Sequence, residues 1–202
     1  MNFLTIDVFL VLFIGMGPVK ALLVYLAATQ GASAEMQRKV ARKAIMTAAV
    51  VGILLLVAGA AFMRILHFSQ GALTVAGGLI LLLLALNMVL GPAQKEEHGA
   101  APDEAALMSL AIYPLGIPLL LNPIGIVALT VFSAESQTLV DLAVLLGMLL
   151  LVAVIDLGIF AVAHRLDKYL THERILVLEK LLGIMLAALA VQLILNGLAD
   201  AG

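Results

Sequence analysis

The chain has 202 residues, of which 64% are hydrophobic and only 12% charged, and its formal net charge at pH 7 is −2. Soluble domains carry about 45–50% apolar and about 25% charged residues, so this composition excludes an ordinary soluble domain and predicts a protein embedded in a lipid bilayer. The small net charge gives no reason to expect nucleic acid as a partner, and the absence of cysteine from the sequence excludes disulfide and thiolate chemistry.

Six apolar stretches along the chain are long enough to cross a membrane. A helix that spans about 30 Å of hydrocarbon needs about 20 apolar residues. The first stretch has nothing basic before Lys20, unlike a signal peptide, so we expect it to be retained as a span. No stretch shows the alternation of a barrel strand, which predicts helices throughout. The stretches cover residues 6–28, 44–66, 71–90, 107–133, 142–163 and 175–196.

The Lys and Arg residues indicate the orientation of these spans. With the N-terminus outside, nine of the eleven lie in inner loops or at the adjoining span ends, which leaves Arg64 outside and Lys20 within a span. Cytoplasmic loops of membrane proteins are enriched in Lys and Arg. Both termini are therefore predicted to lie on the non-cytoplasmic side.

The two halves of the chain are similar at an offset of 105 residues. This similarity predicts a duplication, with residues 1–90 as the first three-helix repeat, 91–106 as a polar cytoplasmic linker and 107–202 as the second repeat. Three spans per repeat is an odd number, so the repeats must have opposite orientations, as in many transporters. The offset pairs Pro18 with Pro123, Gly78 with Gly183, Ala85 with Ala190 and Asn87 with Gln192.

The fourth stretch contains an unusual cluster of helix breakers. Pro114, Pro118 and Pro123 lie within ten residues, and each proline removes a backbone donor and clashes with the preceding turn. A single proline would merely kink a helix for packing, whereas this cluster favours a helix broken into halves or folded as a re-entrant pair. The N-terminus of a half-helix carries about +0.5 of a charge and can hold a carboxylate.

The first stretch repeats this pattern and adds a charge. Gly17 and Pro18 loosen the helix and Lys20 follows, while Asp156 is the only carboxylate deep in any of the six stretches. An ionisable group at the centre of a span costs about 2.5–3.5 kcal/mol on insertion scales, which favours a Lys20–Asp156 pair. Such a pair could be structural, Lys20 could instead snorkel, or both groups could serve proton or ion coupling.

Two further polar residues lie within the stretches, and motifs of common enzyme classes are absent from the sequence. Asn87 and Gln192 occupy equivalent places in the third and sixth stretches, where they can join helices or line a cavity. The sequence contains no zinc-protease motif, no nucleophile elbow and no phosphate-binding glycine loop. We therefore expect neither an enzyme nor a bound metal or cofactor.

Three segments and the prolines of the first and fourth stretches carry a resemblance to a known family. The segments are VAGGLILLLLALNMV (75–89), YPLGIPLLLNPIGI (113–126) and GIMLAALAVQLILNG (183–197). In this order they resemble the MarC family of small neutral amino-acid transporters, which is related to the LysE-type exporters. The resemblance implies a multi-pass protein of the cell inner membrane that moves a solute such as glycine or alanine. Members of that family usually look like Asn-Pro in the first span and Gly-Pro in the fourth. Here the residues before the two prolines are exchanged, as Gly17-Pro18 and Asn122-Pro123. This departure leaves the substrate and any sodium coupling open.

The sequence thus predicts an all-α integral membrane protein with six transmembrane helices in two inverted repeats, the first and fourth spans being broken. We expect a secondary transporter of a small polar solute, such as a neutral amino acid, working by alternating access around a midplane site. A passive channel, a metabolite or ion exporter, and a non-transporting scaffold are the alternatives. Expected partners are the bilayer, a proton or sodium ion and, in a homo-oligomer, further copies of the chain. The predicted substrate-binding residues are Gly17, Pro18, Lys20, Asn122, Pro123 and Gly125, with Lys20 and Asp156 for coupling and Asn87 and Gln192 in support.

Overall fold

A computed structural model of the protein describes residues 5–29, 31–91, 103–163 and 172–201, and every regular element within these ranges is helical. This confirms the predicted all-helical class. The elements are α1 (Thr5–Gly15), α2 (Pro18–Ala28), α3 (Ala34–Leu66), α4 (Gln70–Leu90), α5 (Glu104–Leu110), the π-helical segment η1 (Ala111–Leu120), α6 (Pro123–Glu135), α7 (Leu139–Ala163) and α8 (His172–Ala201).

Four of the described helices, α3, α4, α7 and α8, are long and apolar enough to cross a membrane. A fifth span results if the bent pair of α5–η1 and α6, which meet at 68°, is counted as one. Helix α3 begins well before the predicted residue 44, because the Ser33 hydroxyl accepts a hydrogen bond from the Met36 N–H (3.2 Å) and caps the helix there. Helix α5 begins at Glu104, inside the stretch predicted to be linker.

Both predicted breaks are present. Helix α1 ends at Gly15 and α2 begins at Pro18, while η1 ends at Leu120 and α6 begins at Pro123. Each of these two prolines stands at the first position of its helix, where a missing N–H costs nothing. Pro118 and its neighbour Ile117 have non-helical backbone angles inside η1, so the proline cluster distorts the whole segment before the second break.

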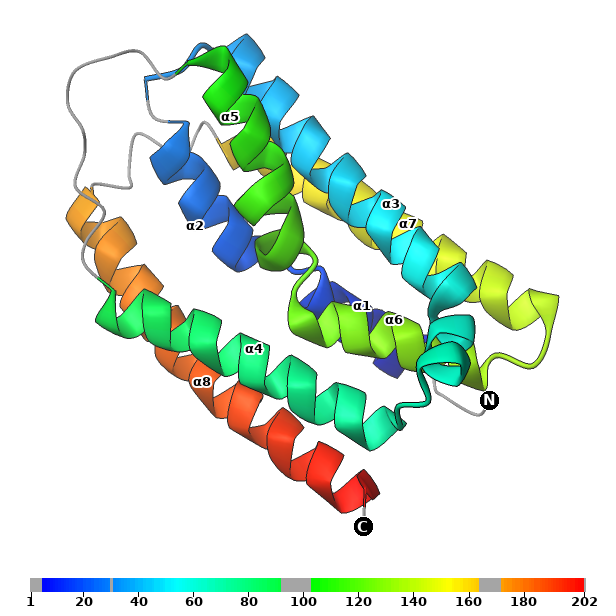
Figure 1. Ribbon diagram of the computed structural model, residues 1–202. Coiled ribbons are helices and arrows are strands. Elements are labelled where there is room, and N and C mark those ends of the chain that lie inside the picture. Colours follow the sequence, from blue (N-terminus) through cyan, green and yellow to red (C-terminus); the bar gives the residue numbers. More distant parts are fainter. Residues whose placement is uncertain (1–4, 30, 92–102, 164–171, 202) are drawn as a thin grey trace.

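The helices form a central group with a long helix pair on either side (Figure 1). Helices α3 and α7 pack together on one side and α4 and α8 on the other, and α1, α2, η1 and α6 lie between them. Most buried apolar side chains belong to one cluster formed by the central group with α3 and α7. A smaller cluster of Leu81, Ile124 and Ala190 joins α4 and α8 to α6. The α4–α8 pair is therefore attached to the rest through a much smaller core.

Helices α4 and α8 approach each other closely at two glycines. A Cβ added to Gly78 would lie 2.9 Å from the Ala190 carbonyl oxygen, and one added to Gly183 would lie 3.2 Å from the Ala85 carbonyl oxygen. The sequence offset of 105 pairs position 78 with 183 and position 85 with 190. Applying it to the contact between Gly78 and Ala190 gives the contact between Gly183 and Ala85. Each of the two glycines thus contacts the residue that the offset predicts from the other contact.

Candidate functional site

Asn122 connects the two breaks. Its backbone N–H donates to the Gly15 carbonyl (2.9 Å), and its side-chain Nδ2 donates to the Ile14 carbonyl (2.7 Å). The last carbonyls of a helix have no partner within the helix, so a break inside an apolar region leaves them in need of donors. Asn122 therefore satisfies the C-terminal end of α1 although it lies more than 100 residues away in the sequence.

The same side chain begins helix α6. Its Oδ1 accepts hydrogen bonds from the backbone N–H groups of Ile124 (2.9 Å) and Gly125 (3.2 Å), which makes Asn122 the N-cap of α6. Asn122 is only 5% exposed, so solvent has little access to replace these bonds. Asparagine carries both a donor and an acceptor group, and this position uses both.

Gly15 and Gly125 allow the backbones of α1 and α6 to touch beside this asparagine. A Cβ added to Gly15 would lie 2.5 Å from the Gly125 Cα, and one added to Gly125 would collide with the Gly15 carbonyl oxygen. Gly125 and its neighbour Pro123 are buried behind the break. Of the predicted substrate-binding residues, Gly125 thus lies in this crossing, and neither it nor Pro123 is among the residues described as lining the cavity beside the breaks.

A cavity of about 520 Å³ lies beside the breaks, between them and helix α8. This volume falls in the range of about 300–1,000 Å³ that is typical of small-molecule sites. Among the described residues that line it, only Asn122 and Gln192 have polar side chains. The lining residues are Phe13, Ile14, Gly17, Pro18, Leu119, Asn122, Leu182, Met185, Leu186, Ala188, Leu189 and Gln192.

Gln192 supplies the polar group on the α8 side of the cavity. Its Nε2 donates to the Asn196 Oδ1 one turn further along α8 (2.7 Å). This bond uses the amide nitrogen of Gln192, and the amide oxygen accepts no hydrogen bond from the described residues. Asn87, its equivalent at the 105-residue offset, is exposed on α4 and does not line this cavity.

The N-terminus of α2 differs from that of α6 in its capping. Its N-cap is Gly17, which has no side chain to accept a hydrogen bond, and Gly17 and Pro18 both line the cavity. The N–H groups of a helix's first turn favour an anionic partner. Of the two half-helix N-termini at the breaks, that of α2 therefore lacks a side-chain cap and lies at the cavity.

Asp156 lies on α7, away from the cavity lining. Its side chain is 0% exposed, and neither carboxylate oxygen has a hydrogen-bond partner among the described residues. Phe160, one turn further along the same face, packs on Tyr25 of α2 with ring centroids 5.0 Å apart, so this face of α7 is turned toward α2. The Lys20 side chain lies outside the described residues, and the Lys20–Asp156 pair stays a prediction.

The α8 wall of the cavity was missed by the sequence reasoning. Leu182, Met185, Leu186 and Leu189 follow the three- and four-residue spacing of one helix face, and Gln192 continues it. Because Gln192 ends this apolar face, the face could have been predicted as a cavity wall from the position of Gln192. In so apolar a helix, however, the pattern does not stand out from its neighbours.

These features define an all-helical integral membrane protein in which two interrupted segments meet beside a cavity. The chain belongs to the MarC family of integral membrane proteins, which it matches over residues 2–201. The resemblance seen in the sequence is thereby confirmed.

Relatives cover nearly the full length of the chain. A UPF0056 membrane protein of Methanocaldococcus jannaschii is 29% identical over 92% of this chain and 91% of its own length. One from Aquifex aeolicus is 29% identical over 98% and 93%, respectively. The UPF0056 membrane protein YhcE of Escherichia coli is 24% identical over 94% and 89%. No solved structure matches the chain.

Proposed function

We propose that the protein is a secondary transporter of a small polar solute, for which a neutral amino acid is the best candidate. The observation that carries this proposal is the cavity of about 520 Å³ that contains Gly17 and Pro18 from one break and Asn122 from the other. Interrupted helices within a membrane are tolerated where they are buried in protein or line a wet cavity, and transporters use them to bind their substrates. Binding and release of the solute need no covalent chemistry, cofactor or metal.

The chemistry of the cavity suits a small zwitterion. Its carboxylate would bind at the uncapped N-terminus of α2, next to Gly17 and Pro18. The oxygen of Gln192 can accept a hydrogen bond from the ammonium group. The remaining wall is apolar, including Phe13 and Leu186, and fits the short side chain of a solute such as alanine.

We propose six spans in two inverted repeats for the architecture, with α1–α2 as the first span and α5–η1–α6 as the fourth. Two observations support it. Helix α1 packs against α6 and α2 packs against η1, so the half-spans exchange partners between the repeats. The contacts of Gly78 with Ala190 and of Gly183 with Ala85 exchange at the same offset.

The charge distribution supports the proposed orientation in the cell inner membrane. The described ends of α1 and α8 that are nearest the chain termini lie toward the same side of the molecule, with the start of α7 (Figure 1). The cations Lys39, Arg42 and Lys43 lie near the start of α3, at the opposite side. By the positive-inside rule, both termini would then lie on the non-cytoplasmic face.

Alternating access would require one part of the molecule to move relative to the other. The α4–α8 pair is suited to this movement because only a small core joins it to α6, and the cavity lies between α8 and the breaks. Tilting of this pair would open the cavity first to one side and then to the other. Asp156, buried without a described partner, would bind the coupling proton or sodium ion, and Lys20 would share that role.

Reconstitution tests the proposal. The purified protein in liposomes is given radiolabelled glycine, alanine or serine with an imposed proton or sodium gradient, and uptake is compared with protein-free liposomes. Accumulation against the solute gradient is expected. Downhill flux alone would favour a passive channel of the same fold. No flux under any gradient, with the fold intact by circular dichroism, would contradict a transport role for these solutes.

A further inference from the structure

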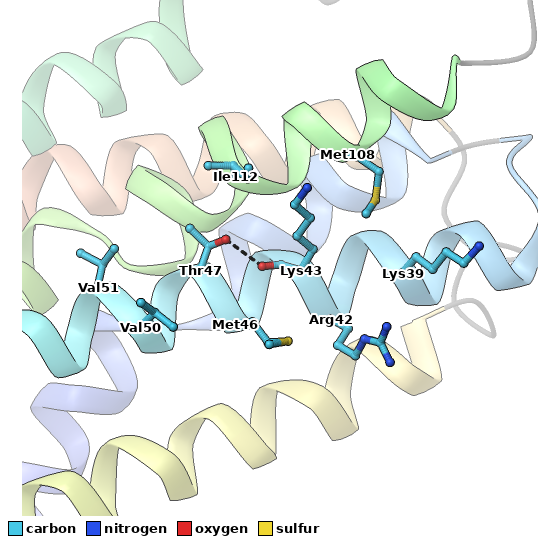
Figure 2. A pocket seen from close by; sticks show the side chains of 9 residues that line it. All are labelled: Lys39, Arg42, Lys43, Met46, Thr47, Val50, Val51, Met108 and Ile112. Atoms are coloured by element: carbon cyan, nitrogen blue, oxygen red, sulfur yellow. Dashed lines mark hydrogen bonds between the residues drawn. The ribbon is translucent and has the colours of Figure 1, made fainter.

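A second hollow lies between α3 and the α5–η1 segment, and it shares no lining residue with the cavity at the breaks. Its volume is about 590 Å³. Figure 2 shows Lys39, Arg42 and Lys43 toward one end, with Met108 beside them, and Val50 and Val51 toward the other. We refer to it as the α3–α5 groove, and it is lined by Lys39, Arg42, Lys43, Met46, Thr47, Val50, Val51, Met108 and Ile112.

The sequence of α3 produces this polarity along one helix face. Lys39, Arg42 and Lys43 recur at spacings of three and four residues, and Met46 and Val50 continue the same face. At a rise of 1.5 Å per residue, the face changes from cationic to apolar over about 16 Å. This length corresponds to the headgroup region of one leaflet and the upper part of its acyl chains.

Two of the three cations have no acidic partner on the part of the chain that the structure describes. Lys39 pairs with Glu35 (3.1 Å) and lies 4.0 Å from Glu104, whereas neither Arg42 nor Lys43 makes a described ion pair. The Thr47 hydroxyl donates to the Lys43 carbonyl (2.9 Å) and is thereby satisfied without a ligand. The groove therefore has positive charge at Arg42 and Lys43 without a described acidic partner, next to an apolar surface.

We propose that the α3–α5 groove binds an anionic phospholipid. The headgroup phosphate would lie at the cationic end, near the Arg42 and Lys43 side chains, and one acyl chain would lie along Val50, Val51 and Ile112. Basic pockets between membrane helices on the cytoplasmic side bind such headgroups, and the positive-inside orientation places this end of α3 in that leaflet. A soluble anion would use only the cationic end, and a neutral lipid only the apolar one. An anionic phospholipid matches both.

The bound lipid would also bridge two parts of the fold. One wall of the groove is α3, and the other is Met108 and Ile112, which belong to the segment that leads to the second break. A lipid held by both walls fastens α5–η1 to α3. Occupancy of the groove therefore stabilises the position of the helix ends that line the transport cavity.

Native mass spectrometry of the purified protein in neutral detergent tests this proposal. Phosphatidylglycerol, phosphatidylcholine and free glycerol phosphate are titrated separately against the wild type. The variants are Arg42→Gln, Lys43→Gln, the double variant and Val50→Trp, which fills the apolar part of the groove. The matched control is Arg64→Gln, which removes one positive charge from the last turn of the same helix, outside the groove.

We expect phosphatidylglycerol to bind more tightly than phosphatidylcholine. Each groove cation removed should weaken phosphatidylglycerol binding by about fivefold, and the double variant by about 25-fold, while Arg64→Gln leaves it within twofold. Val50→Trp should weaken binding of both lipids. Equal affinity for the two lipids, equal effects of the groove and control variants, or free glycerol phosphate binding as tightly as the intact lipid would each overturn the proposal.

Discussion

Replacing Asn122 should destabilise the fold more than the loss of an ordinary helix cap. The change Asn122→Ala removes the bonds to the Ile124 and Gly125 N–H groups and the bond to the Ile14 carbonyl. Loss of an N-cap costs about 1 kcal/mol, and a buried carbonyl left without a donor costs about 1–3 kcal/mol more. We therefore expect the free energy of unfolding to fall by about 2–4 kcal/mol.

A matched control separates these two contributions. The Ser69 side chain caps α4 by accepting from the Ala72 N–H (3.1 Å), and Ser69 is exposed at a helix start with no hydrogen bond to another described helix. Ser69→Ala should cost only the cap, about 1 kcal/mol. Asn122→Asp provides a second comparison, because a carboxylate still caps α6 but cannot donate to the Ile14 carbonyl.

Reversible unfolding in mixed micelles, followed by circular dichroism, measures all three variants. The expected order of stability loss is Asn122→Ala well above Ser69→Ala, with Asn122→Asp also clearly destabilised. A loss in Asn122→Ala no larger than in Ser69→Ala would refute the role of Asn122 as a bridge between the breaks. Wild-type stability in Asn122→Asp would refute the importance of the donated bond.

Three further variants test the neighbouring features. Gly15→Ala should lower the free energy of unfolding by more than 1 kcal/mol because its Cβ would meet the Gly125 backbone, whereas Gly147→Ala, with nothing within 4 Å of its Cβ, should be neutral or stabilising in the same assay. Asp156→Asn should keep the fold, because it removes a buried carboxylate without a described partner. The same variant should abolish the pH or sodium dependence of liposome uptake, and unchanged dependence would exclude Asp156 from coupling. Gln192→Ala should raise the KM for the solute several-fold, whereas Asn87→Ala, outside the cavity, should leave the KM unchanged. Equal effects of the two variants on uptake kinetics would contradict binding of the solute beside Gln192.

The breaks at Gly17–Pro18 and Asn122–Pro123 could be predicted from the sequence because proline acts locally. A proline cannot donate to the preceding turn, and this holds whatever surrounds it. The chain accordingly has a helix beginning at both Pro18 and Pro123. The long apolar helices were predictable for a similar reason, since bilayer thickness sets their length and their polar ends mark their limits.

Contacts between distant segments could not be predicted in this way. The bond from Asn122 to Ile14 depends on how α1 crosses α6, and nothing near either residue specifies that crossing. The α8 wall of the cavity is equally hidden, because most positions of α8 are apolar whether they face lipid or protein. Asn87 and Gln192 show the limit of the repeat itself: the offset pairs them in the sequence, but only Gln192 lines the cavity.

The proposed inverted repeat, with an asymmetric site, would explain why the two breakers differ. Under the proposed inverted repeat, Gly17 and Asn122 are equivalent, yet an asparagine would not fit at position 17, where an added Cβ would lie 2.9 Å from the Phe13 carbonyl oxygen. Asn122 neutralises the N-terminus of α6, whereas Gly17 leaves that of α2 open at the cavity. A site with two equal helix N-termini would attract two anionic groups, but one capped and one open terminus attract a single carboxylate in a defined position. Under the proposed function, this difference between the breakers would give a solute with one carboxylate a single orientation in the cavity.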